Sequence, residues 1–221
     1  MICTKEEIMS DSNKTTQEKI KQANKNNKEI KKNIDYRLPP GQTLTEKCPI
    51  LDLGITPDID SHSWRLEIFG LVKNPLCVSY SYLKRMSQIK DISDFHCVTH
   101  WSKYDVQWGG VSAKFMLEQA DMLKNSKFIT LHSYDNYTTN LPIESLLYDD
   151  VLIAHELFDR PLDIKHGGPV RIAVPKKYAW KSAKWLKAIE IHEEDRSGFW
   201  ELGGYHNKAD PWQEERYSSD E

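Results

Sequence analysis

The octapeptide Phe95-His-Cys-Val-Thr-His-Trp-Ser102 places a cysteine between two histidines at the end of an apolar run. A thiolate is a nucleophile and a soft metal ligand, and imidazole binds metals or transfers protons near neutral pH. The stretch therefore has the residue types of a metal site or a nucleophilic site. A cysteine is also often buried simply as a small hydrophobic residue, so a structural role for Cys97 is equally compatible with these eight residues.

A zinc site is one interpretation of this octapeptide. It would use His96, Cys97 and His100 together with a fourth ligand from elsewhere in the chain. Successive side chains of a strand point to opposite faces, so Cys97 would share a face with Phe95 while His96 points away. The loop would have to fold His100 back toward the thiolate. No cysteine-protease signature surrounds Cys97, which leaves a zinc-dependent hydrolase as an alternative.

Two later segments carry groups that suit a phosphorylated ligand. In His166-Gly-Gly-Pro-Val-Arg171 the glycines permit close approach of the backbone, and the arginine supplies a rigid guanidinium fork. In 177–185, the side chains of Lys181, Ser182 and Lys184 place ammonium and hydroxyl donors between aromatic residues. Taken alone, the first segment is also typical of a tight turn. The second is also typical of a basic surface strand whose lysine stems cover apolar neighbours.

Short strands and two helices are expected to position these segments. Alternating apolar and polar residues predict a strand over Trp64 to Phe69, and an apolar run predicts another over Ile92 to Val98, followed by an exposed loop. Ser112 can cap a helix over Ala113 to Leu123, and a shorter helix is expected around Ser81 to Met86. Further strands are predicted at 76–80, 127–131, 151–158, 170–174 and 185–191. Strands outnumber helices, which predicts an α+β fold with a mixed β-sheet.

Composition divides the 221 residues into a tail and one domain. Residues 1–34 are rich in Lys, Asn, Gln, Glu, Ser and Thr and predict a flexible polar tail. Residues 35–221 are expected to form a single domain that begins at the proline-rich stretch Arg37-Leu-Pro-Pro-Gly-Gln42. The aromatic segment Gly203 to Tyr217 is too apolar for a free tail and is expected to wrap the domain.

The charge balance and the cysteine spacing exclude several functional classes. Thirty Lys and Arg residues against 33 Asp and Glu residues predict no nucleic-acid partner and no anionic membrane partner. The four cysteines form neither a Cys-x-x-Cys pair nor a Cys-x-x-Cys-His haem motif. No secretory signal is visible and no apolar stretch reaches the roughly 18 residues of a membrane span, so we expect a cytoplasmic protein without a membrane span.

Taken together, these motifs resemble the molybdopterin-binding catalytic domain of the sulfite oxidase family, most closely its small single-domain prokaryotic branch. The resemblance implies a molybdenum–molybdopterin cofactor and oxygen-atom transfer to or from a small substrate, which could be a sulfite-like oxyanion, a sulfoxide or an N-oxide. It runs from Arg37 to about Tyr217 and rests on an ordered set of motifs: Arg37-Leu-Pro-Pro-Gly-Gln, Asp94-Phe-His-Cys-Val-Thr, Trp108-Gly-Gly-Val, Tyr137-Thr-Thr-Asn-Leu-Pro142, His166-Gly-Gly-Pro-Val-Arg171, Lys181-Ser-Ala-Lys-Trp-Leu186 and Gly198-Phe-Trp-Glu-Leu-Gly-Gly-Tyr-His206.

The resemblance assigns roles to residues by motif position. Cys97 would ligate molybdenum beside the dithiolene of one molybdopterin, a task that suits a soft thiolate. His100 and His155 are candidate catalytic residues that would hold the substrate or transfer a proton. In sulfite oxidases a tyrosine near the metal takes the place of Ala154-His155-Glu156, which makes sulfite a doubtful substrate here. Pterin and phosphate contacts are expected from Arg37, His166, Arg171, Ser182 and Lys184, and from one of the two neighbours His132 and Ser133.

The resemblance also bears on partners. Eukaryotic sulfite oxidases add a haem domain and a C-terminal dimerisation domain, and neither is recognisable here, so we expect no haem and a separate electron-transfer protein. Periplasmic methionine-sulfoxide reductases of the same family carry an export signal, which is not visible in this chain. A molybdopterin-binding protein without turnover is the alternative. The thiolate of Cys97 argues against it, because holding the pterin alone requires no metal-directed ligand.

Overall fold

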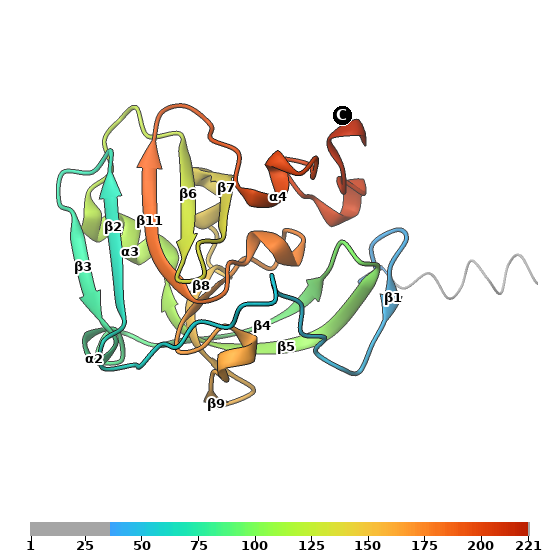
Figure 1. Ribbon diagram of the computed structural model, residues 1–221, viewed down its shortest axis with the longest axis horizontal. Coiled ribbons are helices and arrows are strands. Elements are labelled where there is room, and N and C mark those ends of the chain that lie inside the picture. The colour runs from blue at the N-terminus through green and yellow to red at the C-terminus, as the bar shows by residue number, and fades with distance from the viewer. Residues whose placement is uncertain (1–35, 221) are drawn as a thin grey trace, which may run out of the picture. The chain divides into compact units, whose positions relative to one another are not determined.

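The computed structural model describes residues 36–220 (Figure 1). Of these, residues 38–220 belong to one compact unit, and Tyr36 and Arg37 lie outside it. The predicted polar tail at 1–34 lies outside the described residues. Within the described part, no helix is long and apolar enough to cross a membrane.

The first sheet carries the strand that leads into Cys97. In the described residues it has six strands, and the central one, β5, pairs with β4 on one side and β8 on the other. The pairing of β1 with β5 is parallel and the remaining pairings are antiparallel. The members are β1 (Thr43–Leu44), β4 (Ile89–His96), β5 (Trp101–Ser112), β8 (Leu152–Leu157), β9 (Arg160–Pro161) and β10 (Arg171–Ala173).

The second sheet has five strands in the order β3-β2-β11-β6-β7 within the described residues (Figure 1). The pairing of β11 with β2 is parallel, and the other pairings are antiparallel. Both sheets are therefore mixed, which confirms the predicted α+β class. The members are β2 (Arg65–Gly70), β3 (Leu76–Ser79), β6 (Phe128–Ser133), β7 (Thr138–Pro142) and β11 (Leu186–His192).

Helix α3 (Ala113–Ala120) is the longest helix among the described residues. Ser112 caps it as predicted, because its side-chain oxygen accepts a hydrogen bond from the backbone N–H of Phe115 at 3.2 Å. The helix ends before the predicted Leu123, since Asp121 takes a left-handed conformation with φ 53°. The other helical segments are short: α2 (Tyr80–Leu83), α4 (Phe199–Leu202), η1 (Ile143–Leu146), η2 (Ile164–His166), η3 (Ala179–Lys181), η4 (Pro211–Gln213) and η5 (Ser218–Asp220).

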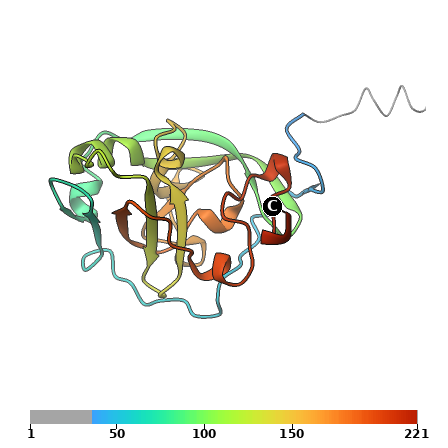
Figure 2. The same ribbon diagram turned by 90° about the horizontal axis from the view of Figure 1, so that it is seen from above.

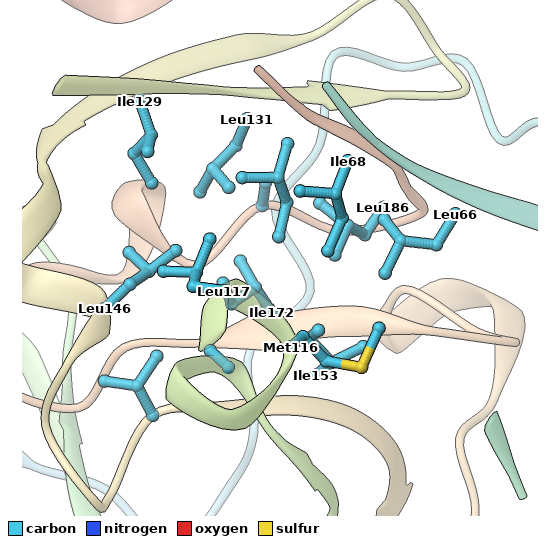
Figure 3. Packing of buried hydrophobic residues seen from close by; sticks show 14 of the residues in the cluster. Leu66, Ile68, Met116, Leu117, Ile129, Leu131, Leu146, Ile153, Ile172 and Leu186 are labelled. Atoms are coloured by element: carbon cyan, nitrogen blue, oxygen red, sulfur yellow. The ribbon is translucent and has the colours of Figure 1, made fainter. Parts of the chain in front are cut away.

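The main hydrophobic core lies between the two sheets and around α3. Figure 3 shows side chains from the second sheet pointing toward α3 and toward residues of β8 and β10. Burial of this much apolar surface is the dominant stabilising term and fixes the strand ends from which the loops start. The labelled residues are Leu66, Ile68, Met116, Leu117, Ile129, Leu131, Leu146, Ile153, Ile172 and Leu186.

Two segments have a secondary structure that differs from the one predicted from the sequence. Residues 101–112, predicted as an exposed loop, form β5, and this strand is stabilised by hydrogen-bonded neighbours on both sides. The Lys-Ser-Ala-Lys segment is not a strand: Lys181 ends η3, and Ser182 to Trp185 form a loop. Trp185 has φ 50°, a conformation that extended strands exclude, so β11 begins only at Leu186.

The C-terminal segment packs against the domain, as its aromatic content predicted. The guanidinium of Arg216 is buried and donates hydrogen bonds to the carbonyl oxygens of Val98 at 2.7 Å and Pro40 at 3.3 Å. Tyr205 and Tyr217 pack edge to face, with ring centroids 5.4 Å apart. Figure 2 shows this end of the chain from above, running beside the strands of the first sheet.

Candidate functional site

A cavity of about 340 Å³ lies at the end of β4, beside Cys97. Segments from many parts of the chain line it: residues 49–53, Phe95, the turn at 97–99, Trp101, Asp135, Tyr137, residues 165–166, Arg171, Ala179 and Trp180 of η3, residues 182–185, Trp200 and Tyr205. A cavity of this size is in the range of small-molecule and cofactor sites.

Cys97 follows the last residue of β4 and is 5% exposed. Its backbone N–H donates to the carbonyl oxygen of Trp101 at 2.9 Å, and the hydroxyl of Thr99 donates to its sulfur at 3.1 Å. Burial raises the pKa of the Cys97 thiol, while Thr99 and the charge of Arg216 oppose that rise. The sulfur is therefore a thiol in the protein alone, and a metal cation at this position would remove its proton.

Side chains from both ends of the compact unit hold the turn that carries Cys97. The amide nitrogen of Gln42 donates to the Cys97 carbonyl oxygen at 3.0 Å. Arg216 donates to the carbonyl oxygen of the next residue, Val98, at 2.7 Å. Because hydrogen bonds from two distant segments fix the turn, the direction of the Cys97 side chain depends on the whole tertiary structure.

The backbone of the glycine-rich turn packs closely against the side chain of Lys184 at Gly167. Gly167 has φ +102°, a left-handed conformation that favours glycine. A Cβ atom at Gly167 would lie 2.9 Å from the Cβ of Lys184, and one at Gly168 would lie 2.1 Å from the carbonyl oxygen of Leu162. Both glycines are therefore required for the close packing that sets this wall of the cavity.

Arg171 lines the cavity from β10 and is 7% exposed. Its guanidinium lies over the rings of Phe95 and Trp108, with its carbon 5.6 Å and 5.2 Å from the ring centroids. It donates to the carbonyl oxygens of His166 at 2.9 Å and Ser182 at 2.6 Å. Burial lowers the pKa of Arg171 to about 10, so the group is still cationic at neutral pH.

No carboxylate of the described residues forms an ion pair with Arg171. A buried cation is normally neutralised by an anionic partner, because its desolvation is costly. Backbone carbonyls and ring faces compensate it only in part here. The arrangement therefore fits an anionic ligand in the cavity.

Lys184, Ser182 and His166 are further polar residues of the lining, which also contains Asp52, Thr99, Asp135 and Lys165. The ammonium of Lys184 lies 3.5 Å from a carboxylate oxygen of Asp52 and donates to the carbonyl oxygen of Lys165 at 3.1 Å. The hydroxyl of Ser182 accepts from the backbone N–H of Val174 at 2.9 Å, which leaves its proton to donate. Burial, followed by the charge of Arg171, lowers the pKa of His166, which keeps its imidazole neutral at pH 7.

Aromatic side chains form the part of the cavity next to Cys97. The indole of Trp180 is stacked on Tyr178 at 5.4 Å between centroids and meets the ring of Tyr205 edge to face at 5.2 Å. Trp200 packs against Tyr205 at 5.0 Å. Cys97 belongs to the same buried cluster, so its sulfur is surrounded mainly by apolar and aromatic groups.

Two tyrosines line the cavity: Tyr137, whose hydroxyl donates to the carbonyl oxygen of Trp180, and Tyr205. Burial raises the pKa of Tyr205 first, and the charges of Tyr217 and Cys97 raise it further, which keeps the O–H protonated at neutral pH. The sequence reasoning did not assign a role to Tyr205, Trp200 or Trp180. The signal was present in the aromatic motif from Gly198 to His206, but only its contacts show which members face the cavity.

The structure brings Cys97, His166, Arg171, Ser182 and Lys184 together around the cavity. Of the remaining predicted residues, Arg37 is exposed and lies outside the compact unit, so its cofactor contact stays a prediction. His100 is exposed and its Nδ1 lies 2.8 Å from the carbonyl oxygen of Gly41. It is not part of the cavity lining.

His155 and the two residues on β6 also lie outside the lining. His155 lies on the side of β8 that faces the main core, because its ring meets that of Tyr80 at 6.3 Å between centroids, and its Nε2 lies 2.6 Å from the amide oxygen of Gln88. His132 lies 3.1 Å from a Glu190 carboxylate oxygen, and Ser133 is buried in the strand. Their predicted roles, like that of His100, gain no support from the geometry and stay predictions.

The zinc interpretation of the octapeptide finds no matching geometry. His96 is buried, its Nδ1 lies 2.8 Å from the hydroxyl of Ser102, and its ring packs on Trp212. His100 is directed toward Gly41. In the part of the chain that the structure describes, no three His, Cys, Asp or Glu side chains are placed to hold a metal ion together.

Comparison with known proteins identifies the family that this chain matches. Residues 53–200 match the family described as oxidoreductase molybdopterin binding domain. The chain is 39% identical over 185 residues to the uncharacterized oxidoreductase YuiH of Bacillus subtilis (strain 168), covering 83% of this chain and 93% of that protein. It is 24% identical over 166 residues to the protein-methionine-sulfoxide reductase catalytic subunit MsrP of Campylobacter jejuni, covering 67% of this chain and 56% of that protein.

Among solved structures, the fold is similar to that of the sulfane dehydrogenase SoxCD from Paracoccus pantotrophus. The TM-score is 0.58 at 20% sequence identity, and the match covers 63% of this chain and 40% of that chain. This likeness establishes a shared fold. The chain spans nearly all of YuiH but about half of the MsrP and SoxCD chains.

Proposed function

Because the chain belongs to the family of oxidoreductase molybdopterin-binding domains, we propose that it holds a molybdenum–molybdopterin cofactor in the cavity beside Cys97 and catalyses oxygen-atom transfer. The observation that carries this proposal is the pairing of two groups in one cavity. A buried thiol suits a soft metal centre, and a buried guanidinium without a carboxylate partner among the described residues suits a phosphate.

The described residues fit both the metal and the phosphate group of such a cofactor. Cys97 would ligate the metal, with the Thr99 hydroxyl donating to its sulfur at 3.1 Å. Arg171 and Lys184 would neutralise the phosphate, and the hydroxyl of Ser182 would donate to it. The absence of a side chain at Gly167 would let backbone groups approach the pterin.

When bound, the cofactor supplies the two-electron change of molybdenum that gives or takes an oxygen atom. The residues of the chain would orient the substrate, keep water away from it and donate a hydrogen bond to it. Trp180 and Trp200 would limit the access of water to the space beside Cys97. The phenol of Tyr205, which its raised pKa keeps protonated, would donate a hydrogen bond to the oxygen of a substrate in this space.

The walls around Cys97 favour a neutral, polarisable substrate over an oxyanion. The cluster that contains Cys97 is aromatic and apolar, whereas Arg171 lies in a separate cluster with Phe95 and Trp108. Sulfur-containing groups make favourable contacts with aromatic rings. We therefore propose a sulfoxide, or second an N-oxide, as the oxygen donor. The relative MsrP is the catalytic subunit of a protein-methionine-sulfoxide reductase, which is compatible with that class.

Electrons for this reaction would come from a separate electron-transfer protein. The described part of the chain provides no redox centre of its own beyond the proposed cofactor site, since its three described cysteines, Cys48, Cys77 and Cys97, are all free. The predicted cytoplasmic location and the absence of haem stay predictions.

Elemental analysis tests the proposal directly. The protein would be expressed in a host that makes molybdopterin, and molybdenum would be measured per chain in the wild type and in Cys97→Ala. We expect molybdenum close to one per chain in the wild type, and a lost or altered metal absorption spectrum in the variant. Cys77→Ala is the matched control, because Cys77 is an exposed cysteine on β3 and should leave metal and spectrum unchanged.

Turnover separates an enzyme from a cofactor-binding protein without activity. Reduction of dimethyl sulfoxide and of trimethylamine N-oxide would be followed with a reduced viologen dye as the electron donor. Wild type that carries molybdenum but reduces neither compound would contradict the substrate class. An unchanged metal spectrum in Cys97→Ala would rule out Cys97 as the ligand, and zinc in place of molybdenum would favour the hydrolase alternative.

A further inference from the structure

A fully buried ion pair lies directly behind the aromatic wall of the cavity. The ammonium of Lys181 and a carboxylate oxygen of Glu201 are 2.6 Å apart, and their side chains are 0% and 1% exposed. Lys181 also donates to the backbone carbonyl oxygen of Asn140 at 2.8 Å and to its side-chain oxygen at 3.0 Å. All three protons of the ammonium are thereby used within the protein.

The same oxygen of Glu201 receives two further hydrogen bonds. The indole N–H of Trp180 donates to it at 2.8 Å, and the hydroxyl of Thr139 donates to it at 2.8 Å. The carboxylate thus joins three separate elements, α4, η3 and β7. None of these contacts reaches the solvent, so the network is not screened by water or salt.

Trp180 is the member of this network that faces the cavity. Its carbonyl oxygen accepts from the phenol of Tyr137 at 2.7 Å, so backbone and side chain are both held. Its ring lies nearly parallel to Tyr178, with 14° between the planes, and nearly perpendicular to Tyr205, with 81° between the planes. The indole therefore has one fixed orientation in the wall next to Cys97.

Stability alone does not account for a charged pair at this place. Replacing a buried ion pair by apolar side chains of similar volume is often neutral or stabilising. Apolar neighbours would not, however, define the rotation of the indole, because they offer no acceptor to its N–H. A fixed carboxylate oxygen supplies that acceptor, and Lys181 neutralises the charge that comes with it.

We propose that Glu201 is a positioning residue that fixes the indole of Trp180 as a flat substrate-binding wall, which selects sulfoxides carrying a planar aromatic substituent. The selectivity rests on the proposed sulfoxide-reducing function of the same cavity. The physical reason is that a fixed indole face stacks on a planar ring, whereas a rotating indole loses that contact.

Two double variants test the role of the acceptor at equal charge. Lys181→Met with Glu201→Gln removes both charges but keeps an amide oxygen for the indole N–H. Lys181→Met with Glu201→Leu removes both charges and the acceptor. Neither leaves a buried charge unpaired, so both are expected to fold, which thermal unfolding would verify. The readouts are near-ultraviolet circular dichroism and kcat/KM for methyl phenyl sulfoxide and dimethyl sulfoxide.

We expect the Gln double variant to keep the wild-type near-ultraviolet signal of the Trp180–Tyr178 stack, and the Leu double variant to lose part of it. The ratio of kcat/KM for methyl phenyl sulfoxide over dimethyl sulfoxide should fall about tenfold in the Leu variant relative to the Gln variant, the size of one lost packing contact. Bound molybdenum should be equal in both.

Identical dichroism and identical ratios in the two double variants would overturn the proposal. Failure of the proposed function has a different signature, because wild type with molybdenum would then reduce neither sulfoxide. That result overturns the selectivity, while the dichroism of the two variants, which needs no turnover, still decides whether Glu201 positions Trp180.

Discussion

Replacing Gly167 by alanine should destabilise the domain and weaken cofactor binding together. The new Cβ would lie 2.9 Å from both Cβ and Cγ of Lys184, closer than real side chains approach each other. The backbone angle of φ +102° adds about 1–2 kcal/mol for a left-handed alanine. Overpacking typically costs about 1–3 kcal/mol, so we expect a total loss of about 2–5 kcal/mol in the free energy of unfolding.

Gly54→Ala is the matched control for this prediction. Gly54 also has a positive φ, +84°, but a Cβ there would meet nothing within 4 Å. Its cost should therefore be the conformational part alone, about 1–2 kcal/mol. Urea unfolding followed by circular dichroism measures both values. Molybdenum per chain should fall in Gly167→Ala, because Lys184 must move away from the proposed phosphate site, and should stay at the wild-type level in Gly54→Ala.

Equal stability losses in the two variants would show that Lys184 gives way without strain, and the steric argument would fail. Full molybdenum content in Gly167→Ala, measured after gel filtration, would remove the support for Lys184 as a phosphate ligand. The two results are independent, so packing and cofactor binding are judged separately.

Three further predictions concern charge at and around the site. Lys181→Met alone should lower the free energy of unfolding by about 3–5 kcal/mol, because it leaves the buried Glu201 carboxylate without its cation. Adding Glu201→Gln should restore most of that loss, as measured by urea unfolding. Additive losses in the double variant would contradict this coupling. Burial, followed by the charge of Lys84, lowers the pKa of His155 in the folded protein below its ordinary value of 6.5. The unfolded chain therefore binds a proton more readily, so His155 causes no loss of stability above pH 6.5 and an increasing loss as the pH falls below it. Unfolding at pH 7.5 and 5.5 should show a smaller decrease in His155→Gln than in wild type, and an equal decrease would exclude this histidine as a cause. Arg171→Met should reduce retained molybdenum at least tenfold and Arg171→Lys by less, because only arginine offers the fork; stoichiometric metal in the Met variant would refute Arg171 as the anion ligand.

The family and the local elements could be read from the sequence because their signals are local. Cys97 at the end of a strand, Ser112 as a helix cap and the alternation over Trp64 to Phe69 each depend on a few neighbouring residues. The mixed α+β class and the molybdopterin-binding family are confirmed on that basis.

Sequence reasoning failed where distant partners decide the conformation. Residues 101–112 contain one short alternating stretch, Tyr104-Asp-Val-Gln-Trp108, followed by two glycines, and pairing with β4 and β8 extends the strand over the whole segment. The segment around Lys181 looked like a basic strand that would offer its ammonium to a phosphate. In the structure that ammonium is buried on Glu201, 20 residues later in the chain, and is not available to a ligand.

The sequence by itself determined the types of chemistry in this protein: a thiol at a strand end, cations on glycine-rich and aromatic segments, and the order that marks the family. Only the tertiary structure decided which of these groups share one cavity. It brought Tyr205, Trp200 and Trp180 to Cys97 and placed His155 on the side of β8 that faces the main core. The physical reason is that the side a residue faces follows from strand register and from hydrogen bonds between segments far apart in the chain, and a local residue pattern by itself does not name the partner segments.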